Sequence, residues 1–164
     1  RVGKDGKLFT MYKFRSMVTN AEELKKKLAE ENGQSDRFIF KMKDDPRITK
    51  IGHFIRKTSL DEFPQFVNVL LGDMSVVGPR PHMLKHTEQY SALIDKYMVR
   101  HLVKPGVTGW AQVTGYRGET KTLEQMEGRV KRDVWYIENW TFFLDLKIIV
   151  VTVLNMFKGE KNAY

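Results

Sequence analysis

Two adjacent carboxylates, Asp61 and Glu62, are the strongest candidates for chemistry in this sequence because an apolar helical pattern follows them directly. The apolar residues of that pattern recur at the spacing of one helix face: Phe63, Phe66, Val67, Leu70 and Leu71. Pro64 lacks an N–H and fits only the first turn of a helix. The helix is therefore predicted to begin at about Asp61 and to end at Gly72, which places both carboxylates at its positive end.

A carboxylate in that position has two interpretations. Asp61 could simply cap the helix and complement its dipole, which is the ordinary role of such a residue and the one that spacing alone favours. An ionised carboxylate near cations can also attack phosphorus and form an aspartyl-phosphate. The choice depends on which cations the fold brings to Asp61.

Basic residues flank the pair on both sides in the sequence. Arg80 stands between two prolines in a Gly-Pro-Arg-Pro segment, so it is either a surface turn residue or a stiffly held phosphate clamp. Lys13 and Arg15 are expected on the same side of an extended segment over residues 8–17, because side chains alternate along a strand. They are either ordinary solvated charges or parts of one charged face. Arg56, five residues before Asp61, could equally be a surface ion-pair partner. His82 and His86 are four residues apart, but no third metal ligand is near them in the sequence.

The elements that must position these residues are mainly helices. The capping sequence Thr19-Asn20-Ala21-Glu22 predicts a helix to about Glu31 that ends near Gly33, and residues 109–115 predict a short strand or loop. Further helices are predicted over residues 87–101, 122–139 and 140–157, the second of them opened by the capping sequence at Thr122. In the first of these, the residues expected to face inward are Tyr90, Leu93, Ile94, Tyr97 and Met98. The expected fold is a mostly helical α+β single domain over residues 1–164, with a few short strands and an apolar C-terminal helix.

That C-terminal helix has two open interpretations. It could be a buried core helix, or its aromatic residues could lie at a membrane surface beside a basic protein. Its longest apolar run, residues 148–157, is about half of the roughly 20 residues that a membrane-spanning helix needs.

Composition limits the function. The 164 residues carry a formal charge of +8, which favours anionic partners such as nucleic acid, anionic lipid or phosphorylated small molecules. The absence of cysteine excludes disulfides, thiolate zinc sites and cysteine nucleophiles. A content of 41% hydrophobic and 12% aromatic residues favours a folded chain over a disordered one.

In the order and residue content of its motifs, the sequence resembles the bacterial sugar transferase family of monotopic phosphoglycosyl transferases, over essentially its whole length. The matching segments are YKFRSM (12–17), DPRIT (45–49) with Gly52 and Arg56, SLDEFPQ (59–65), NVL (68–70), GDMS (72–75), VGPRP (77–81), KPG (104–106), TGWAQV (108–113), RGET (117–120), NW (139–140) and DLK (145–147).

The resemblance implies transfer of a sugar-1-phosphate from a UDP-sugar to undecaprenyl phosphate, with UMP as the leaving group. Asp61 would be the nucleophile that holds the phosphosugar covalently, Glu62 its catalytic partner, and Mg²⁺, with Asp61 as ligand, the cofactor. The family motifs also place substrate or phosphate-binding residues at Arg56, Arg80, Lys13, Arg15, Arg117 and Asp133.

The RGET segment is most similar to the subgroup that transfers glucose-1-phosphate, so UDP-glucose is the expected donor and UDP-galactose the next. The family implies the cytoplasmic face of the inner membrane, a lipid surface as partner and the option of a homo-oligomer. Its hydrophobic re-entrant segment precedes the YKFRSM block, so the anchoring part is expected to lie outside this chain. The alternatives are a basic nucleic-acid-binding module, predicting a basic stripe with exposed aromatics, and a non-catalytic membrane-surface module. The enzyme, with no nucleic acid partner, is favoured.

Overall fold

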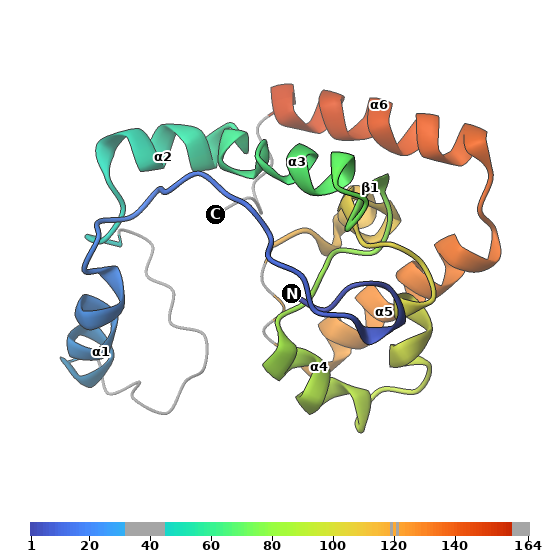
Figure 1. The fold of residues 1–164 in the computed structure, drawn as a ribbon, viewed down its shortest axis with the longest axis horizontal. Helices are drawn as coiled ribbons and strands as arrows, with labels where there is room; N and C mark the ends of the chain where they lie inside the picture. The colour runs from blue at the N-terminus through green and yellow to red at the C-terminus, as the bar shows by residue number, and fades with distance from the viewer. Residues whose placement is uncertain (32–44, 119, 121, 159–164) are drawn as a thin grey trace.

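The computed structural model describes residues 1–31, 45–118, 120 and 122–158, and it confirms the α+β prediction. Helices surround a small parallel sheet of two strands, β1 (Ser75–Val77) and β2 (Gly106–Thr108), in which Ser75 pairs with Gly106 and Val77 with Thr108 (Figure 1). The helices are α1 (Ala21–Glu31), α2 (Lys50–Lys57), α3 (Gln65–Leu70), α4 (Leu84–Ser91), α5 (Leu123–Glu138) and α6 (Phe142–Lys158). Short helical turns lie at η1 (Lys4–Gly6), η2 (Leu60–Glu62), η3 (Tyr97–His101) and η4 (Gln112–Tyr116). The predicted helix end at Gly33 and Glu119 of the RGET segment lie outside the described residues.

Helix α5 is central to the core because it contributes to both buried clusters. Its N-terminus is capped as predicted, since the Thr122 hydroxyl accepts a hydrogen bond from the backbone N–H of Gln125 (3.3 Å). One cluster joins α5 to η3 and the other joins it to β1 and α6: Ile94, Tyr97, Met126, Val130 and Val134 in the first, Val77, Tyr136 and Ile148 in the second.

The prediction of one helix over residues 87–101 is wrong. Helix α4 ends at Ser91, and η3 begins at Tyr97 after Lys96 adopts a left-handed backbone (φ 58°). The Asp95 carboxylate accepts a hydrogen bond from the Lys96 N–H (2.9 Å), a local bond that competes with a continuing helix. The break buries Ile94 and Tyr97 but leaves Leu93 and Met98 exposed. Residues 112–116 likewise form a helical turn where a strand or loop was expected.

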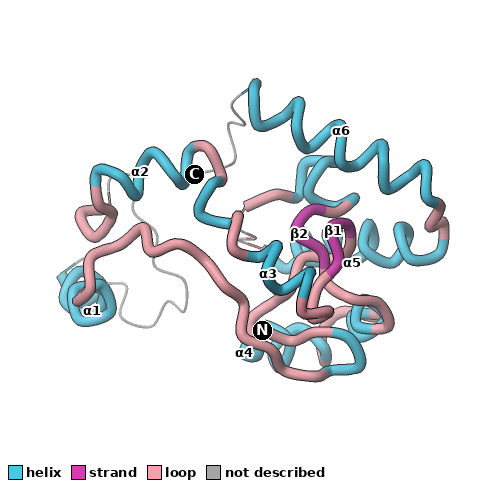
Figure 2. Tube along the Cα trace, turned by 45° about the horizontal axis from the view of Figure 1, so that its top comes forward, coloured by secondary structure: helices cyan, strands magenta, loops and turns pink. Residues whose placement is uncertain are grey.

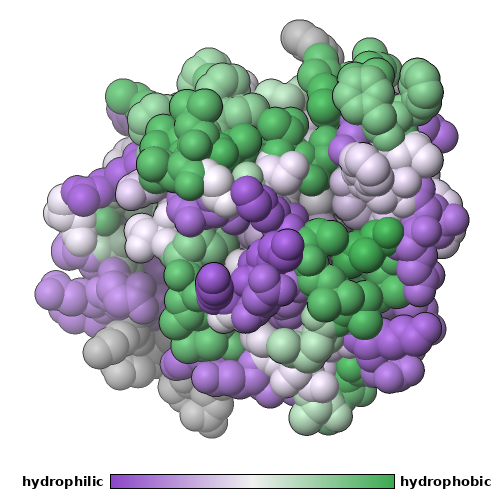
Figure 3. All heavy atoms as spheres, turned by 45° about the vertical axis from the view of Figure 1, so that its right-hand side comes forward, coloured by the Kyte–Doolittle hydropathy of each residue, from purple (hydrophilic) through white to green (hydrophobic). Residues whose placement is uncertain are grey.

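Helices α2, α3 and α6 lie along one edge of the molecule (Figures 1 and 2). Each of these helices exposes apolar side chains. Leu70 of α3 is 87% exposed and Phe143 of α6 is 79% exposed, whereas Ile148 of α6 is fully buried. Figure 3 shows hydrophobic side chains gathered along this upper edge. The C-terminal helix therefore packs one side into the core and presents the other outward. No described helix combines the length and hydropathy needed to cross a bilayer.

Gly52 fixes the start of α2, the helix that leads into the carboxylate turn. A Cβ at this position would lie 2.0 Å from the backbone oxygen of Ser16, to which Thr49 also donates its backbone N–H (3.1 Å). Because the obstructing atom is backbone, we expect Gly52→Ala to lower the free energy of unfolding by about 1–3 kcal/mol, despite the better helix propensity of alanine. Denaturant unfolding measures this, with His53→Ala, exposed on the same helix, as the control. Equal stability of the two variants would contradict the close approach.

Candidate active site

Asp61 and Glu62 lie in the tight turn η2, ahead of α3 and outside it. The predicted helix start at Asp61 is therefore wrong, because α3 begins at Gln65 and Pro64 precedes its first residue. Ser59 has a left-handed backbone (φ 58°), and the N–H of Glu62 donates to the Ser59 carbonyl (3.2 Å), which closes a turn of three-residue spacing. The turn buries Asp61, which is 5% exposed, and leaves Glu62 in the wall of a pocket.

Lys13 reaches both carboxylates from a distant extended segment. The backbone N–H of Phe14 donates to the Asp61 carbonyl (3.0 Å), and that of Tyr12 donates to the Asn68 side chain (3.0 Å). The Lys13 Nζ consequently lies 2.8 Å from Glu62 Oε1 and 3.6 Å from Asp61 Oδ2. Asn68 is fully buried and was not among the predicted site residues. The sequence does carry a signal for it, because this polar residue stands between two valines in an otherwise apolar stretch.

Arg80 binds Glu62 through both branches of its guanidinium. The two N–O distances are 2.6 and 3.3 Å, so the contact is bidentate. Burial would raise the pKa of Glu62, but the charges and hydrogen bonds of Arg80 and Lys13 outweigh it and hold that pKa well below its usual range. Glu62 is therefore ionised at neutral pH and holds two cations beside Asp61.

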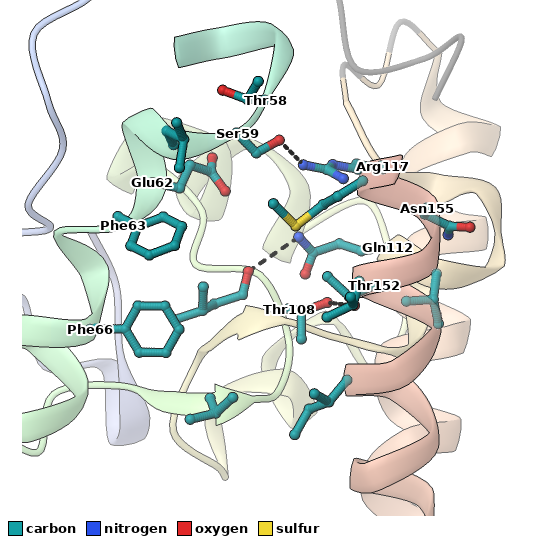
Figure 4. A pocket seen from close by; sticks show the side chains of 17 residues that line it. Thr58, Ser59, Glu62, Phe63, Phe66, Thr108, Gln112, Arg117, Thr152 and Asn155 are labelled. Atoms are coloured by element: carbon teal, nitrogen blue, oxygen red, sulfur yellow. Dashed lines mark hydrogen bonds between the residues drawn. The ribbon is translucent and has the colours of Figure 1, made fainter. Parts of the chain in front are cut away.

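Arg117 approaches the carboxylate turn from the opposite side of the pocket. Its guanidinium donates to the Ser59 hydroxyl (2.6 Å), two residues before Asp61 (Figure 4). The backbone on both sides of Arg117 is fixed by Arg129, which donates to the carbonyls of Tyr116 and Gly118 (2.8 Å each). Arg129 is buried and was not predicted as a site residue.

Asp133 lies behind the site and contacts no open surface, since it is 2% exposed. It accepts hydrogen bonds from Arg100 at 2.7 and 3.2 Å, and Arg100 in turn donates to the backbone carbonyl of Arg80 (2.7 Å). Arg100 also contacts the ring of His82, whose Nδ1 lies 2.7 Å from the Tyr97 hydroxyl. The structure thus places Asp133 where it supports the Arg80 segment, and its contact with a substrate stays a prediction.

The structure also describes the two other predicted basic residues, Arg56 and Arg15. The Arg56 guanidinium donates to the Ser16 hydroxyl (2.8 Å), and Arg15 is exposed. Contact of either with a substrate stays a prediction. Among the predicted basic residues, Lys13 and Arg80 bind Glu62, and Arg117 binds Ser59 of the carboxylate turn.

An apolar pocket of about 500 Å³ opens beside Glu62, between η2 and α3 on one side and α6 on the other (Figure 4). Its polar lining includes Arg117, Ser59 and the paired hydroxyls of Thr108 and Thr152 (2.6 Å apart). The rest of the wall is mainly aliphatic and aromatic.

A divalent cation has one available protein ligand in this arrangement. Asp61 Oδ1 is buried and has no hydrogen-bond partner among the described residues. Within the same residues no group of three or more His, Cys, Asp or Glu side chains could hold a metal. Mg²⁺ commonly binds through one or two carboxylates together with substrate phosphates, so the donor set fits a metal that arrives with a diphosphate.

These features define a class of protein, a basic α+β domain with a carboxylate pair beside an apolar pocket. The cations around that pair are suited to binding phosphate groups. Within that class the chain belongs to the bacterial sugar transferase family, whose model matches residues 1–159.

Its relatives include transferases that act on undecaprenyl phosphate. The chain is 52% identical, over its whole length, to the UDP-glucose:undecaprenyl-phosphate glucose-1-phosphate transferase of Escherichia coli K12, of which it covers 32%. It is 48% identical over 93% of its length to the undecaprenyl-phosphate galactose phosphotransferase of Salmonella typhimurium, covering 31% of that protein. It is 43% identical over 98% of its length to the uncharacterized sugar transferase EpsL of Bacillus subtilis, covering 68%. The chain thus spans about a third of the length of the first two.

Proposed function

We propose that this protein transfers a sugar-1-phosphate from a UDP-sugar to undecaprenyl phosphate and releases UMP, as the first membrane step of a polysaccharide or glycoconjugate. The observation that carries the proposal is the position of Asp61, buried in a strained turn 3.6 Å from Lys13 and next to a glutamate that binds Arg80. The names of the relatives support the same substrates.

The chemistry would proceed in two displacements at phosphorus. In the first, an Asp61 carboxylate oxygen bonds to the β-phosphorus, the bond to the bridging oxygen breaks, and UMP leaves with that electron pair. In the second, an oxygen of undecaprenyl phosphate bonds to the same phosphorus and the Asp61 carboxylate leaves. Lys13 and Arg80 neutralise the charge that gathers on the phosphoryl oxygens.

Glu62 is a poor candidate for a general base. Both of its oxygens accept hydrogen bonds from cations, and its lowered pKa leaves it little tendency to take a proton. The acceptor phosphate is also mostly ionised at neutral pH, so little proton removal is required. Glu62 therefore serves to position Lys13 and Arg80.

Mg²⁺ is part of the proposal, with Asp61 as its protein ligand. When bound, it would neutralise diphosphate oxygens and favour departure of UMP. The buried, unpartnered Asp61 Oδ1 supports this assignment.

The donor is proposed to be UDP-glucose, with UDP-galactose second, because relatives of both kinds are similar to this chain at about half of its positions. The proposed location is the cytoplasmic face of the inner membrane. The exposed apolar edge formed by α2, α3 and α6 supports contact with a lipid surface. The convergence of Lys13, Arg80 and Arg117 on one turn favours a phosphate site over the basic stripe of a nucleic-acid-binding module.

The proposal is tested by giving the protein, in membranes, a panel of UDP-sugars with Mg²⁺ and undecaprenyl phosphate and measuring UMP. We expect the largest rate with UDP-glucose and a smaller one with UDP-galactose. A chelator should remove most of the activity and added Mg²⁺ restore it. Absence of UMP with every donor would overturn the proposed reaction.

A further inference from the structure

We propose that the apolar pocket beside Glu62 binds the first isoprene units of the prenyl-phosphate acceptor, with the phosphate at the Arg117 end. The inference rests on the proposed function and deepens it, because it assigns the acceptor a site between η2 and α6 that is separate from the donor's.

The walls of the pocket match a hydrocarbon chain. Three residues of the η2–α3 segment face three of α6 across it: Leu60, Phe63 and Phe66 opposite Ile149, Val153 and Met156. The hydroxyls of Thr108 and Thr152 bond to each other, so they need no ligand. Gln112 and Asn155 also line the pocket, and Gln112 Oε1 has no hydrogen-bond partner among the described residues, so the match to a hydrocarbon rests on the apolar side chains of the two facing walls.

The pocket opens onto the apolar edge of the molecule. Phe63 and Phe66 on one rim are 52% and 43% exposed, and Val153 on the other is 46% exposed. The same helices carry the exposed apolar residues Leu70 and Val150 away from the pocket. A chain whose remainder lies in a lipid bilayer could therefore enter directly from that surface.

The opposite end of the pocket is polar and lies next to the reacting carboxylate. Glu62 and Arg117 both line it, and Arg117 is held on Ser59, two residues from Asp61. An amphipathic ligand with one anionic end therefore has a single favourable direction in the pocket, with its phosphate toward Arg117 and Asp61. This is the direction that the second displacement requires.

The volume limits what the pocket can hold. About 500 Å³ is within the usual range of small-molecule sites, roughly 300–1,000 Å³, and is far too small for a whole undecaprenyl chain. The pocket would therefore distinguish the first isoprene units and be indifferent to total chain length beyond them.

The test blocks the pocket without touching the carboxylate turn. Val153→Trp on α6 fills it from a half-exposed rim position, and Val150→Trp, one turn away on the same helix, exposed and outside the lining, is the matched control. We expect Val153→Trp to weaken binding of farnesyl phosphate, measured calorimetrically without any UDP-sugar, at least tenfold, and to lower transfer to undecaprenyl phosphate similarly. Stoichiometric UMP release from UDP-glucose in the absence of acceptor should be unchanged, and Val150→Trp should resemble the wild type.

Chain length gives a second readout in the wild-type protein. Farnesyl phosphate should bind at least tenfold more tightly than dimethylallyl phosphate, and Val153→Trp should abolish that preference. Equal affinity for the two phosphates in the wild type would overturn the inference. Loss of acceptor-independent UMP release in Val153→Trp would instead assign the pocket to the nucleotide. Failure of the wild type to release UMP would overturn the proposed reaction. The binding measurements would still show whether the pocket binds a prenyl chain.

Discussion

Asp61→Asn is expected to reduce UMP formation by roughly 10³-fold or more, the scale seen when a covalent nucleophile is removed. Asparagine has the shape of aspartate but neither its charge nor its nucleophilicity. The turn that holds the residue is closed by backbone bonds from Glu62 to Ser59 and from Phe14 to the Asp61 carbonyl, which the substitution leaves in place. The loss should therefore be chemical and the fold should be retained.

Two measurements separate nucleophilic loss from other effects. Intact-mass analysis of the wild type after rapid mixing with UDP-glucose should detect a protein heavier by one phosphosugar, and Asp61→Asn should lack that species. Asp5→Asn, in an exposed turn, serves as the control and should behave as the wild type. Undiminished UMP release by Asp61→Asn would remove Asp61 as the nucleophile and leave the carboxylate with a structural role only.

The sequence predicted the helical content well because the decisive signals are local. Thr122 and the apolar residues after Trp140 specify α5 and α6 through capping and periodicity alone. The start of α3 could not be placed in the same way. Ser59 adopts a left-handed backbone that few non-glycine residues adopt, and the resulting tight turns displace the helix to Gln65. Residue types and their spacing do not reveal the left-handed backbone of Ser59.

The apolar stripe over residues 63–71 illustrates a second limit. Periodicity predicts that these side chains share a face, but it does not say whether the face is buried in the protein. In the structure Phe63, Leu70 and Leu71 are all more than half exposed, as are parts of α2 and α6 on the same edge. Periodicity therefore identifies the apolar face but not the partner that covers it.

The residues that support the site were missed because they act through backbone carbonyls far away in the chain. Arg100 holds the carbonyl of Arg80, and Arg129 holds those on both sides of Arg117. In the sequence each is one basic residue among 28 lysines and arginines, with no spacing that relates it to a carboxylate pair. Only the packing of α5 against η3 makes them neighbours of the site.

Asp133 is the buried counter-ion of this support. Burial raises its pKa, and the charges of Arg100 and Arg129 oppose that shift. Burial in turn lowers the pKa of Arg129 to about 10, a value at which it is still charged at neutral pH. Arg100 and Arg129 thus share the Asp133 carboxylate as their counter-ion. Arg100 holds the segment that carries Arg80, and Arg129 holds the segment that carries Arg117. Arg80 and Arg117 are both candidates for binding phosphate.

Asp133→Asn should therefore lower the free energy of unfolding by about 3–5 kcal/mol, the usual result of leaving a buried charge without its partner. Activity of the folded fraction should also fall, through a higher KM for the UDP-sugar, because Arg100 would no longer hold the Arg80 carbonyl in place. Denaturant unfolding beside steady-state kinetics measures both, with Glu138→Gln, exposed on the same helix α5, as the control. Replacing a residue whose only role is to bind substrate is expected to change the free energy of unfolding by only about 0.5 kcal/mol. If Asp133→Asn were as stable as the wild type and yet inactive, Asp133 would be a substrate ligand after all, and the carboxylate would have to reach the pocket by a rearrangement of η3.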